Sequence, residues 1–484
     1  DVIRVEDTYY MVSTTMHFMP GCEILQSFDL VHWEHVTYVY ETLDHTDAQQ
    51  LKSGQNIYGQ GMWAASLRYH EGRFYICFVA NDTRKTYLYT SEKIDGPWKK
   101  QLIEGFYHDG SLLFDEDGRN YIVYGNDEIW ITELNEDLTA PKKDGLHRLL
   151  VSDHKNPELG YEGSHIQKIN GYYYIFLVHS LRDRWMRTEA CFYSDSLEGE
   201  FTGGDVLCDD RGYCGQGVAQ GGIVDTPDGK WYAMLFQDSG AVGRIPILLP
   251  VTWKDHFPVF GQNGHVPEEI EVHSTRPGYI YQPLVGSDDF CNGLLPRWQF
   301  NHDPDPRYYH LDALQGTYTI TTREVCTELT QAVNTLTQRM SYPSCAAEVT
   351  VDASALKEGD VAGLCALQGC YAAVGITKHH GKYEVLMLDK KEDGILDMTE
   401  GTVVESHQMD FRLEADFCNM KDEARCYYRV NKGDWLPIGT VHKLYFKLDH
   451  FTGCRFGLFC YAAEETGGSA CFRDFKYYDV DEIS

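Results

Sequence analysis

The stretch that decides the fold is Ser111-Leu-Leu-Phe-Asp-Glu-Asp-Gly-Arg-Asn-Tyr-Ile-Val-Tyr124. A short apolar run leads into an Asp-Gly turn and then into an aromatic-rich run, which is typical of a β-hairpin. The motif recurs five times, at intervals of roughly 45–65 residues. The equivalent tyrosines are Tyr10, Tyr75, Tyr121, Tyr174 and Tyr232. This repetition predicts a five-bladed β-propeller, and it disfavours the alternative of a generic antiparallel sandwich, whose strands do not repeat one signature in a fixed phase.

The repeat stops after Phe260-Gly261, where the texture of the sequence changes. We therefore expect a propeller over residues 1–262, a connector with prolines and glycines over 263–284, and a second domain over 285–484. About ten short strand-like runs without the propeller repeat predict a β-sandwich for the second domain. The whole chain is thus expected to be all-β.

Two segments of the predicted sandwich bear on its strands and on its contact with the propeller. The apolar run Leu444–Leu448 is interpreted as one of its strands. The block Leu329–Met340 alternates polar and apolar residues, and it is open between a strand and a loop that reaches the propeller. We expect the sandwich to dock on the propeller and to narrow its pocket with a loop near Thr330–Arg339.

The composition excludes some functions. The 484 residues include 42 basic and 73 acidic side chains, for a net charge of −31. Such a chain is a poor partner for nucleic acid, which needs a basic surface. We interpret the acidity as an aid to solubility, to which a neutral sugar substrate is indifferent.

The 15 cysteines are an odd number without metal-site spacing, so they are interpreted as reduced, mostly buried thiols. This favours a cytoplasmic location over a secreted one, although secretion stays open because the chain starts inside a strand. No apolar run has the length of about 20 residues that a membrane span needs. A homo-oligomer is neither indicated nor disfavoured.

Two carboxylates stand in the same phase of successive repeats. Asp109 and Glu162 each precede a repeated hairpin, where side chains face the propeller channel, and each is followed by glycine. Paired carboxylates at one axial site are what glycoside hydrolysis needs. From position alone, turn formation is the more frequent role of such residues. The aromatic residues Trp63, Phe18 and Tyr161 lie near the same phase and are candidates for stacking on sugar rings, with burial in the core as the alternative.

At this point the motifs carry a resemblance. They are Phe18-Met-Pro-Gly21, Met62-Trp-Ala-Ala-Ser-Leu67, Asp109-Gly-Ser-Leu-Leu-Phe114, Tyr161-Glu-Gly-Ser-His165 and Gln220-Gly-Gly-Ile-Val-Asp225. In this order they resemble glycoside hydrolase family 43, which comprises β-xylosidases and α-L-arabinofuranosidases built on five-bladed propellers, many with a C-terminal concanavalin-like sandwich. The resemblance implies inverting hydrolysis, with Glu162 as general acid and Asp109 orienting it and raising its pKa. It also implies substrate contacts for Gln220 and Arg244.

Two departures from the family pattern follow. The family's general base would stand two residues before Asp1, outside the given sequence. Gln220 occupies a position where many members carry a histidine at a calcium or water site. We expect no required cofactor, and a structural calcium at Gln220, Asp303–Asp305 or Asp389–Asp397 stays open, although solvated acidic loops fit the last two segments better.

The sequence therefore predicts an exo-acting, inverting β-xylosidase that acts on xylo-oligosaccharides or arabinoxylan fragments. An α-L-arabinofuranosidase is the first alternative. A non-catalytic sugar-binding propeller is the second, and it applies if the base aspartate is absent from the intact protein.

Overall fold

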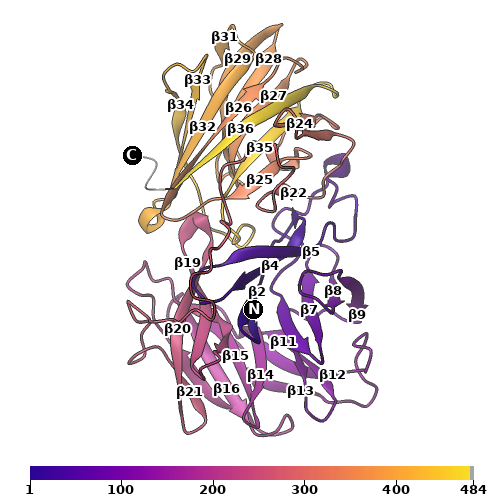
Figure 1. Cartoon of the computed structure of the whole chain (residues 1–484), viewed down its shortest axis with the longest axis vertical. Coiled ribbons are helices and arrows are strands. Elements are labelled where there is room, and N and C mark those ends of the chain that lie inside the picture. Colours follow the sequence, from indigo (N-terminus) through magenta and orange to yellow (C-terminus); the bar gives the residue numbers. More distant parts are fainter. Residues whose placement is uncertain (480–484) are drawn as a thin grey trace.

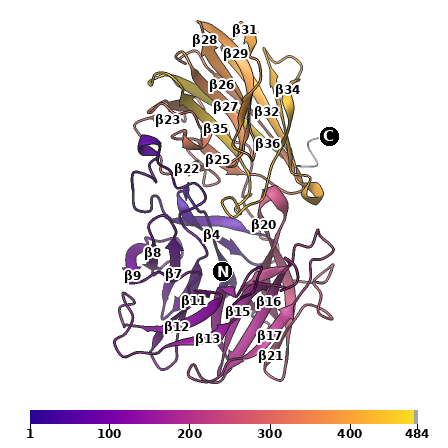
Figure 2. The same cartoon turned by 180° about the vertical axis from the view of Figure 1, so that it is seen from behind.

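The computed structural model describes residues 1–479 and consists of two all-β domains, one above the other (Figure 1). The propeller occupies the lower part, in indigo to pink, and the sandwich occupies the upper part, in orange to yellow. The N-terminus lies in the middle of the propeller in the front view and in the view from behind (Figure 2). The predicted fold class is confirmed.

The propeller consists of five antiparallel sheets of four strands, each in simple sequence order. The first blade contains β1 Val2–Val5, β2 Thr8–Ser13, β4 Gly21–Ser27 and β5 Glu34–Tyr40. The second contains β6 Ser66–His70, β7 Arg73–Ala80, β8 Lys85–Ser91 and β9 Lys99–Ile103. The third contains β10 Ser111–Phe114, β11 Asn120–Asn126, β12 Glu128–Leu134 and β13 His147–Ser152. The fourth contains β14 Glu162–Ile169, β15 Tyr172–Ser180, β16 Arg187–Ser194 and β17 Thr202–Leu207, and the fifth β18 Ala219–Asp225, β19 Trp231–Asp238, β20 Arg244–Lys254 and β21 Phe257–Phe260.

Each repeated motif forms the hairpin between the first two strands of a blade. In the fourth blade the turn residues Asn170 and Gly171 both have positive φ, 51° and 84°, as a two-residue turn that matches strand twist requires. Alternate residues of β15 then bury opposite faces. Ile175 packs in the core shared with the third blade, and Phe176 packs in the core shared with the fifth. Because both faces are covered, the strand is an unbroken apolar run.

The sandwich packs two sheets around the largest core of the protein. One sheet contains β22 Gln299–Asn301, β25 Leu336–Arg339, β27 Asp360–Leu367, β28 Ala372–His379, β29 Lys382–Lys390, β30 Leu396–Met398, β31 Thr402–Val404 and β35 Arg455–Ala462. The other contains β23 Tyr309–Asp312, β24 Thr317–Thr321, β26 Ser344–Asp352, β32 Gln408–Asp416, β33 Glu423–Arg429, β34 Leu436–Lys443 and β36 Ser469–Asp479. The 3-10 helices are η1 Lys52–Gly54, η2 Gly240–Val242, η3 Leu329–Gln331 and η4 Cys418–Met420.

The two domains share a sheet. The short strand β3 Phe18–Met19, which lies in the first blade's connection, pairs with β22 and so extends the sandwich sheet into the propeller. Two further contacts hold this joint. Gln299 Nε2 donates to the carbonyl of Pro20 at 2.6 Å, and Arg339 pairs with Glu23 at 2.5 Å. The sandwich is therefore docked rigidly and can shape the end of the propeller that it covers.

Two sequence interpretations change here. The run Leu444–Leu448 is not a strand, because β34 ends at Lys443 and β35 begins at Arg455. The side chain of Gln368 takes the place of a neighbouring strand there, since it accepts from the backbone N–H of Tyr445 and donates to its carbonyl. The block Leu329–Met340 contains both predicted alternatives: η3, whose Gln331 donates to the carbonyl of Gly54 in the propeller, and the strand β25.

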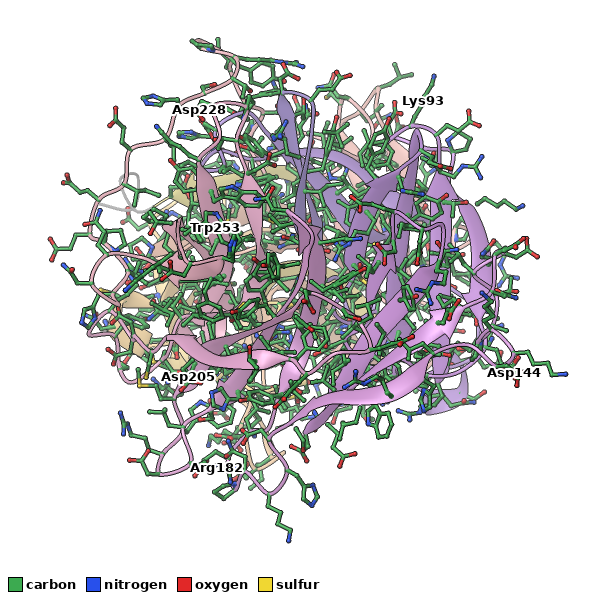
Figure 3. The ribbon with its side chains drawn as sticks, turned by 90° about the horizontal axis from the view of Figure 1, so that it is seen from below. Lys93, Asp144, Arg182, Asp205, Asp228 and Trp253 are labelled. Carbon is green, nitrogen blue, oxygen red and sulfur yellow. The ribbon has the colours of Figure 1, made fainter. Side chains whose placement is uncertain are left out.

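Charged residues populate the outside of the propeller. In the view from below, Lys93, Asp144 and Arg182 stand at its periphery (Figure 3). All 15 cysteines lie within the described residues and are free thiols. Among residues 1–479, no helix is long and apolar enough to cross a membrane.

Candidate active site

A cavity of about 450 Å³ lies at the end of the propeller channel that the sandwich covers. Its volume is in the range typical of sites for small ligands. All five blades contribute to its wall, and so does the sandwich. The charged, aromatic and amide side chains of the propeller in this wall are Asp1, Trp63, His108, Asp109, Asn126, Glu162, His165, Trp185, Arg187, Gln220, Phe236 and Arg244. The sandwich adds Arg339, Leu448, Phe451 and Thr452.

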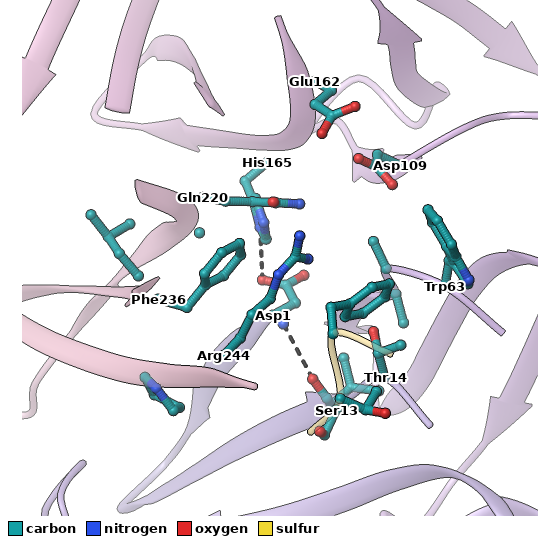
Figure 4. A pocket seen from close by; sticks show the side chains of 18 of the residues that line it. Asp1, Ser13, Thr14, Trp63, Asp109, Glu162, His165, Gln220, Phe236 and Arg244 are labelled. Atoms are coloured by element: carbon teal, nitrogen blue, oxygen red, sulfur yellow. Dashed lines mark hydrogen bonds and ion pairs between the residues drawn. The ribbon is translucent and has the colours of Figure 1, made fainter. Parts of the chain in front are cut away.

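Glu162 and Asp109 lie side by side in this cavity (Figure 4). Glu162 is the first residue of β14, and its Oε2 accepts a hydrogen bond of 2.7 Å from Asn126 Nδ2. Asp109 is buried, with φ of 48°, and its Oδ2 accepts a 3.0 Å hydrogen bond from the backbone N–H of Gly163. The backbone N–H of the residue after Glu162 thus holds the carboxylate of Asp109, so the two carboxyl groups lie next to each other.

His108 joins the two acids. Its Nε2 lies 3.6 Å from Asp109 Oδ2 and 3.6 Å from Glu162 Oε2. Burial opposes protonation of this imidazole, but the two carboxylates outweigh it and raise the pKa of His108 to about 9. Burial also raises the pKa of Asp109, His108 opposes this shift, and the neighbouring negative charge of Glu162 adds to it. The protonation states of His108 and Asp109 therefore depend on each other.

Arg244 brings a second positive charge to the cluster. Its Nε donates to Asp238 Oδ1 at 3.2 Å, and its guanidinium lies 4.3 Å from the ring centres of both Phe236 and Phe451. Burial lowers the pKa of Arg244 to about 10, while Glu162 and Asp109 oppose that shift. Arg244 thus stays charged at neutral pH, held between two rings and directed toward the carboxylates (Figure 4).

The floor of the cavity is a network around Arg68. Its guanidinium donates to Asp1 Oδ2 at 2.6 Å, to Ser111 Oγ at 2.7 Å and to the carbonyl of Leu112 at 2.9 Å. The other carboxylate oxygen of Asp1 lies 3.2 Å from His165 Nδ1. These contacts link the first four blades across the channel. Both carboxylate oxygens of Asp1 are thereby paired, one with Arg68 and the other with His165.

The structure brings five of the seven predicted site residues together. Glu162, Asp109, Trp63, Gln220 and Arg244 all line the cavity. Trp63 meets Phe451 edge to face at 5.1 Å. Gln220 packs against Gly163. A Cβ added at Gly163 would lie 2.7 Å from the Cγ of Gln220.

Two predicted stacking residues are corrected, because neither lines the cavity. Phe18 is fully buried at the domain joint, where the guanidinium of Arg455 lies 3.7 Å from its ring centre. Tyr161 packs on His179 and Phe192 within the fourth blade. Tyr161 directly precedes Glu162, but adjacent side chains of an extended chain point to opposite faces. Phe18 lies in β3, which pairs with β22 at the domain joint.

Sequence reasoning missed several residues of the site, among them His108, Arg187 and Phe451. His108 directly precedes Asp109, and this adjacency was the available signal. Arg187 is a buried residue of the cavity wall and pairs with Asp238. Phe451 comes from the sandwich loop, about 200 residues after the last blade, and no local pattern points to it.

Three side chains of the cavity could act as metal ligands. In the part of the chain that the structure describes, one group of His, Cys, Asp and Glu places its ligand atoms within 4.8 Å of one another, namely His108, Asp109 and Glu162. With its pKa raised to about 9, His108 is protonated at neutral pH and has no free lone pair at Nε2. A metal at this group would have to displace the proton of His108, and the two carboxyl groups supply its other ligand atoms.

The acidic segments considered for calcium do not fit it either. Asp303 pairs with His45, and both oxygens of Asp305 accept from Arg307. In the second segment, Asp389 pairs with His442 and Asp397 with Lys391. Calcium takes six to eight oxygen ligands, and carboxylates already bound to basic side chains do not supply them.

The propeller, its axial carboxylate pair and the closing sandwich define a carbohydrate-cleaving enzyme of the glycoside hydrolase class. Residues 1–258 match the model of Glycosyl hydrolases family 43, and residues 287–478 match the Beta xylosidase C-terminal Concanavalin A-like domain. The chain belongs to family 43, as the sequence resemblance implied.

Among curated relatives, a beta-xylosidase of Formosa agariphila is 26% identical over 99% of this chain and 87% of its own length. A non-reducing end alpha-L-arabinofuranosidase of Bacteroides ovatus is 25% identical over 65% of this chain and 61% of its own length. Among solved structures, a bifunctional GH43-CE chain of Bacteroides eggerthii is 42% identical, with a TM-score of 0.91, over 100% of this chain and 62% of that one. This chain thus spans less than two thirds of the length of that bifunctional protein.

Proposed function

We propose that this chain is an exo-acting, inverting glycoside hydrolase that releases xylose from the non-reducing ends of xylo-oligosaccharides or arabinoxylan fragments. The observation that carries the proposal is the pair Glu162 and Asp109, which lie side by side in an axial cavity. The beta-xylosidase names of several relatives support the choice of sugar.

In this proposal Glu162 is the general acid. Its carboxyl group reaches into the cavity, and Asn126 Nδ2 holds Oε2 in place. When the glycosidic bond breaks, Glu162 gives its proton to the leaving oxygen, which would otherwise depart as a basic alkoxide. Asp109 is anchored by the Gly163 N–H and lies beside the acid, where two charged carboxylates repel each other. His108 and Arg244 limit that repulsion, so the cluster holds its charges at close range.

Exo action follows from the closed end of the channel. Phe451 stands between Trp63 and Arg244, and its carbonyl accepts a 3.2 Å hydrogen bond from the backbone N–H of Arg244. Gly243 has φ of 96°, and a Cβ there would lie 2.7 Å from the backbone N of Gly453, so the loop approaches the blade as closely as glycine allows. This wall supports exo action in the proposal, because it favours a chain end over a polysaccharide that runs through the cavity.

The general base is assigned from the family resemblance alone. By the resemblance it stands two positions before Asp1, at the head of β1. An inverting pair leaves roughly 6.5–9.5 Å between acid and base for the attacking water. We expect a version of the chain extended upstream through this aspartate to form the product with inverted anomeric configuration, which proton NMR of the first-formed sugar detects. A retained anomer contradicts the assignment.

An α-L-arabinofuranosidase is the second candidate. It is favoured by the Bacteroides ovatus relative and by an engineered family member, 27% identical with a TM-score of 0.85, whose description names endo-xylanase and exo-arabinofuranosidase activity. A sugar-binding propeller without turnover is the third, and it would bind xylose without cleaving any glycoside.

Activity assays on the extended chain separate these functions. We expect release of 4-nitrophenol from the β-D-xyloside to exceed that from the α-L-arabinofuranoside. The reverse order supports the arabinofuranosidase. Binding of xylobiose without hydrolysis of either glycoside supports the non-catalytic propeller.

A further inference from the structure

An exposed tryptophan stands in the wall of the cavity and has no part in the reaction described above. Trp185 is 43% exposed, although tryptophan is normally well covered. No ring contact and no hydrophobic core within residues 1–479 includes this side chain. A large apolar face left open inside a cavity is a surface for a ligand.

The ring is held in place from behind. The guanidinium of Arg187 lies 5.0 Å from its centre, and Arg187 is itself buried and paired with Asp238. This cation–π contact occupies one face of the indole and orients the ring. The opposite face is the one available to a ligand.

The loop that carries Trp185 is held by three hydrogen bonds. It connects β15 to β16 and is closed by the hydrogen bond from Leu181 N to the carbonyl of Met186. Ser180 Oγ donates to the carbonyl of Arg184 and accepts from Met186 N at 2.8 Å. A platform on such a loop keeps its position without a ligand, so little entropy is lost on binding.

Trp185 lies on the side of the general acid. Glu162 begins the first strand of the fourth blade, and Trp185 stands in the loop between the second and third strands of that same blade. Leu159, three residues before the acid, lines the cavity too, and its carbonyl accepts from the backbone N–H of Ser180 beside the loop. Trp63 and Phe451 come instead from the second blade and from the sandwich.

The acid side is the leaving-group side, because Glu162 must reach the oxygen that departs. We propose that Trp185 is the stacking platform for the sugar ring of the leaving group, and that it makes the enzyme prefer oligosaccharides to simple glycosides. The inference rests on the proposed function, since that function places the leaving group beside Glu162. Indole faces stack on the apolar faces of pyranose rings, which explains an open tryptophan here.

Two substrates whose leaving groups are both unactivated alcohols test the proposal. Xylobiose leaves a sugar ring and methyl β-D-xyloside leaves methanol, so they differ in the ring alone. For Trp185→Ala we expect kcat/KM on xylobiose to fall about tenfold, as the loss of one aromatic contact predicts, while the methyl glycoside stays within twofold. Trp185→Phe should recover most of the loss. Tyr69→Ala, an exposed aromatic at the opposite end of the channel, is the matched control and should change neither substrate.

Equal losses on both substrates, or no loss on xylobiose, overturn the inference. Calorimetric binding of xylobiose and of methyl β-D-xyloside to Glu162→Gln, with and without Trp185→Ala, separates the platform from turnover. If the wild type hydrolyses neither substrate but Trp185→Ala still weakens xylobiose binding alone, the platform stands and the hydrolase proposal fails. If the alanine change does not weaken xylobiose binding, the platform is refuted.

Discussion

The two ends of the propeller channel are built from the same five hairpins, yet their charges are arranged differently. The open lower end contains a cavity of about 410 Å³, in which Arg4 forks onto Asp225 and Lys168 pairs with Asp115. Each cation there has its own carboxylate. At the upper end, His108 alone stands at equal distance from two carboxylates, and Arg244 is shared between Asp238 and the same pair.

The difference shows where chemistry is possible on this fold. Paired charges at the lower end are mutually satisfied and contribute to structure, with the small energies of partly exposed ion pairs. In the cluster at the upper end, burial and close charges shift the pKa values of His108, Asp109 and Arg244. Shifted pKa values are typical of functional sites. The upper residues Asp109, Glu162 and Arg244 lie just before a strand or at its first residue, whereas the lower ones lie in the hairpins that build the blades.

The largest expected effect separates the two ends directly. Glu162→Gln should reduce turnover of substrates with basic leaving groups by about 10²–10⁴-fold, because the proton donor is lost. Substrates with good leaving groups, such as 4-nitrophenyl glycosides, should lose far less. Asp225→Asn at the lower end is the control and should stay within twofold of wild type. Equal losses on both substrate types would assign Glu162 a structural role.

The second prediction concerns the sandwich wall of the upper cavity. Phe451→Ala removes the ring between Trp63 and Arg244, so we expect about a tenfold lower kcat/KM, mainly through a higher KM. Steady-state kinetics and a thermal melt measure activity and folding together. An unchanged KM in a folded variant would show that the sandwich does not shape the substrate pocket. Leu436→Ala, an exposed side chain on β34 away from the cavity, is the control.

The third prediction uses the raised pKa of His108. Because the folded pKa of about 9 exceeds the unfolded value of about 6.5, its stabilisation is complete below pH 6.5 and is lost as the pH rises through 9. The free energy of unfolding should fall across this window with a slope of at most about 1.4 kcal/mol per pH unit. Denaturant titrations at several pH values measure it. His108→Gln should flatten the slope, whereas His70→Gln at the lower end should not.

The smallest effect is expected at the lower end. Arg4→Met breaks a pair whose partner Asp225 is 37% exposed, so the loss of stability should be about 0.2–1 kcal/mol, with activity unchanged. Chemical unfolding and the xyloside assay measure the two quantities. A loss of activity comparable to that of Glu162→Gln would remove the distinction between the two ends.

Local pattern accounts for most of the propeller and for part of its site. The hairpins were visible because a turn such as Asn170-Gly171 and the apolar runs beside it are local in sequence. Asp109 and Glu162 were found because they occupy the same phase of successive repeats. Their roles as acid and orienting residue are still proposals, which the Glu162→Gln comparison tests.

The sequence by itself thus determined the all-β class, the five blades and the two carboxylates, since these depend on periodicity and turn chemistry within short segments. Only the tertiary structure decided which aromatic residues reach the cavity. Phe18 and Tyr161 pack against other protein side chains. Phe451 does line the cavity, and it belongs to a loop that follows the apolar run Leu444–Leu448. That run resembles a strand, but Gln368 pins it as a loop against the propeller. Contacts between residues so distant in the chain leave no periodic trace, and they decide how the pocket is closed.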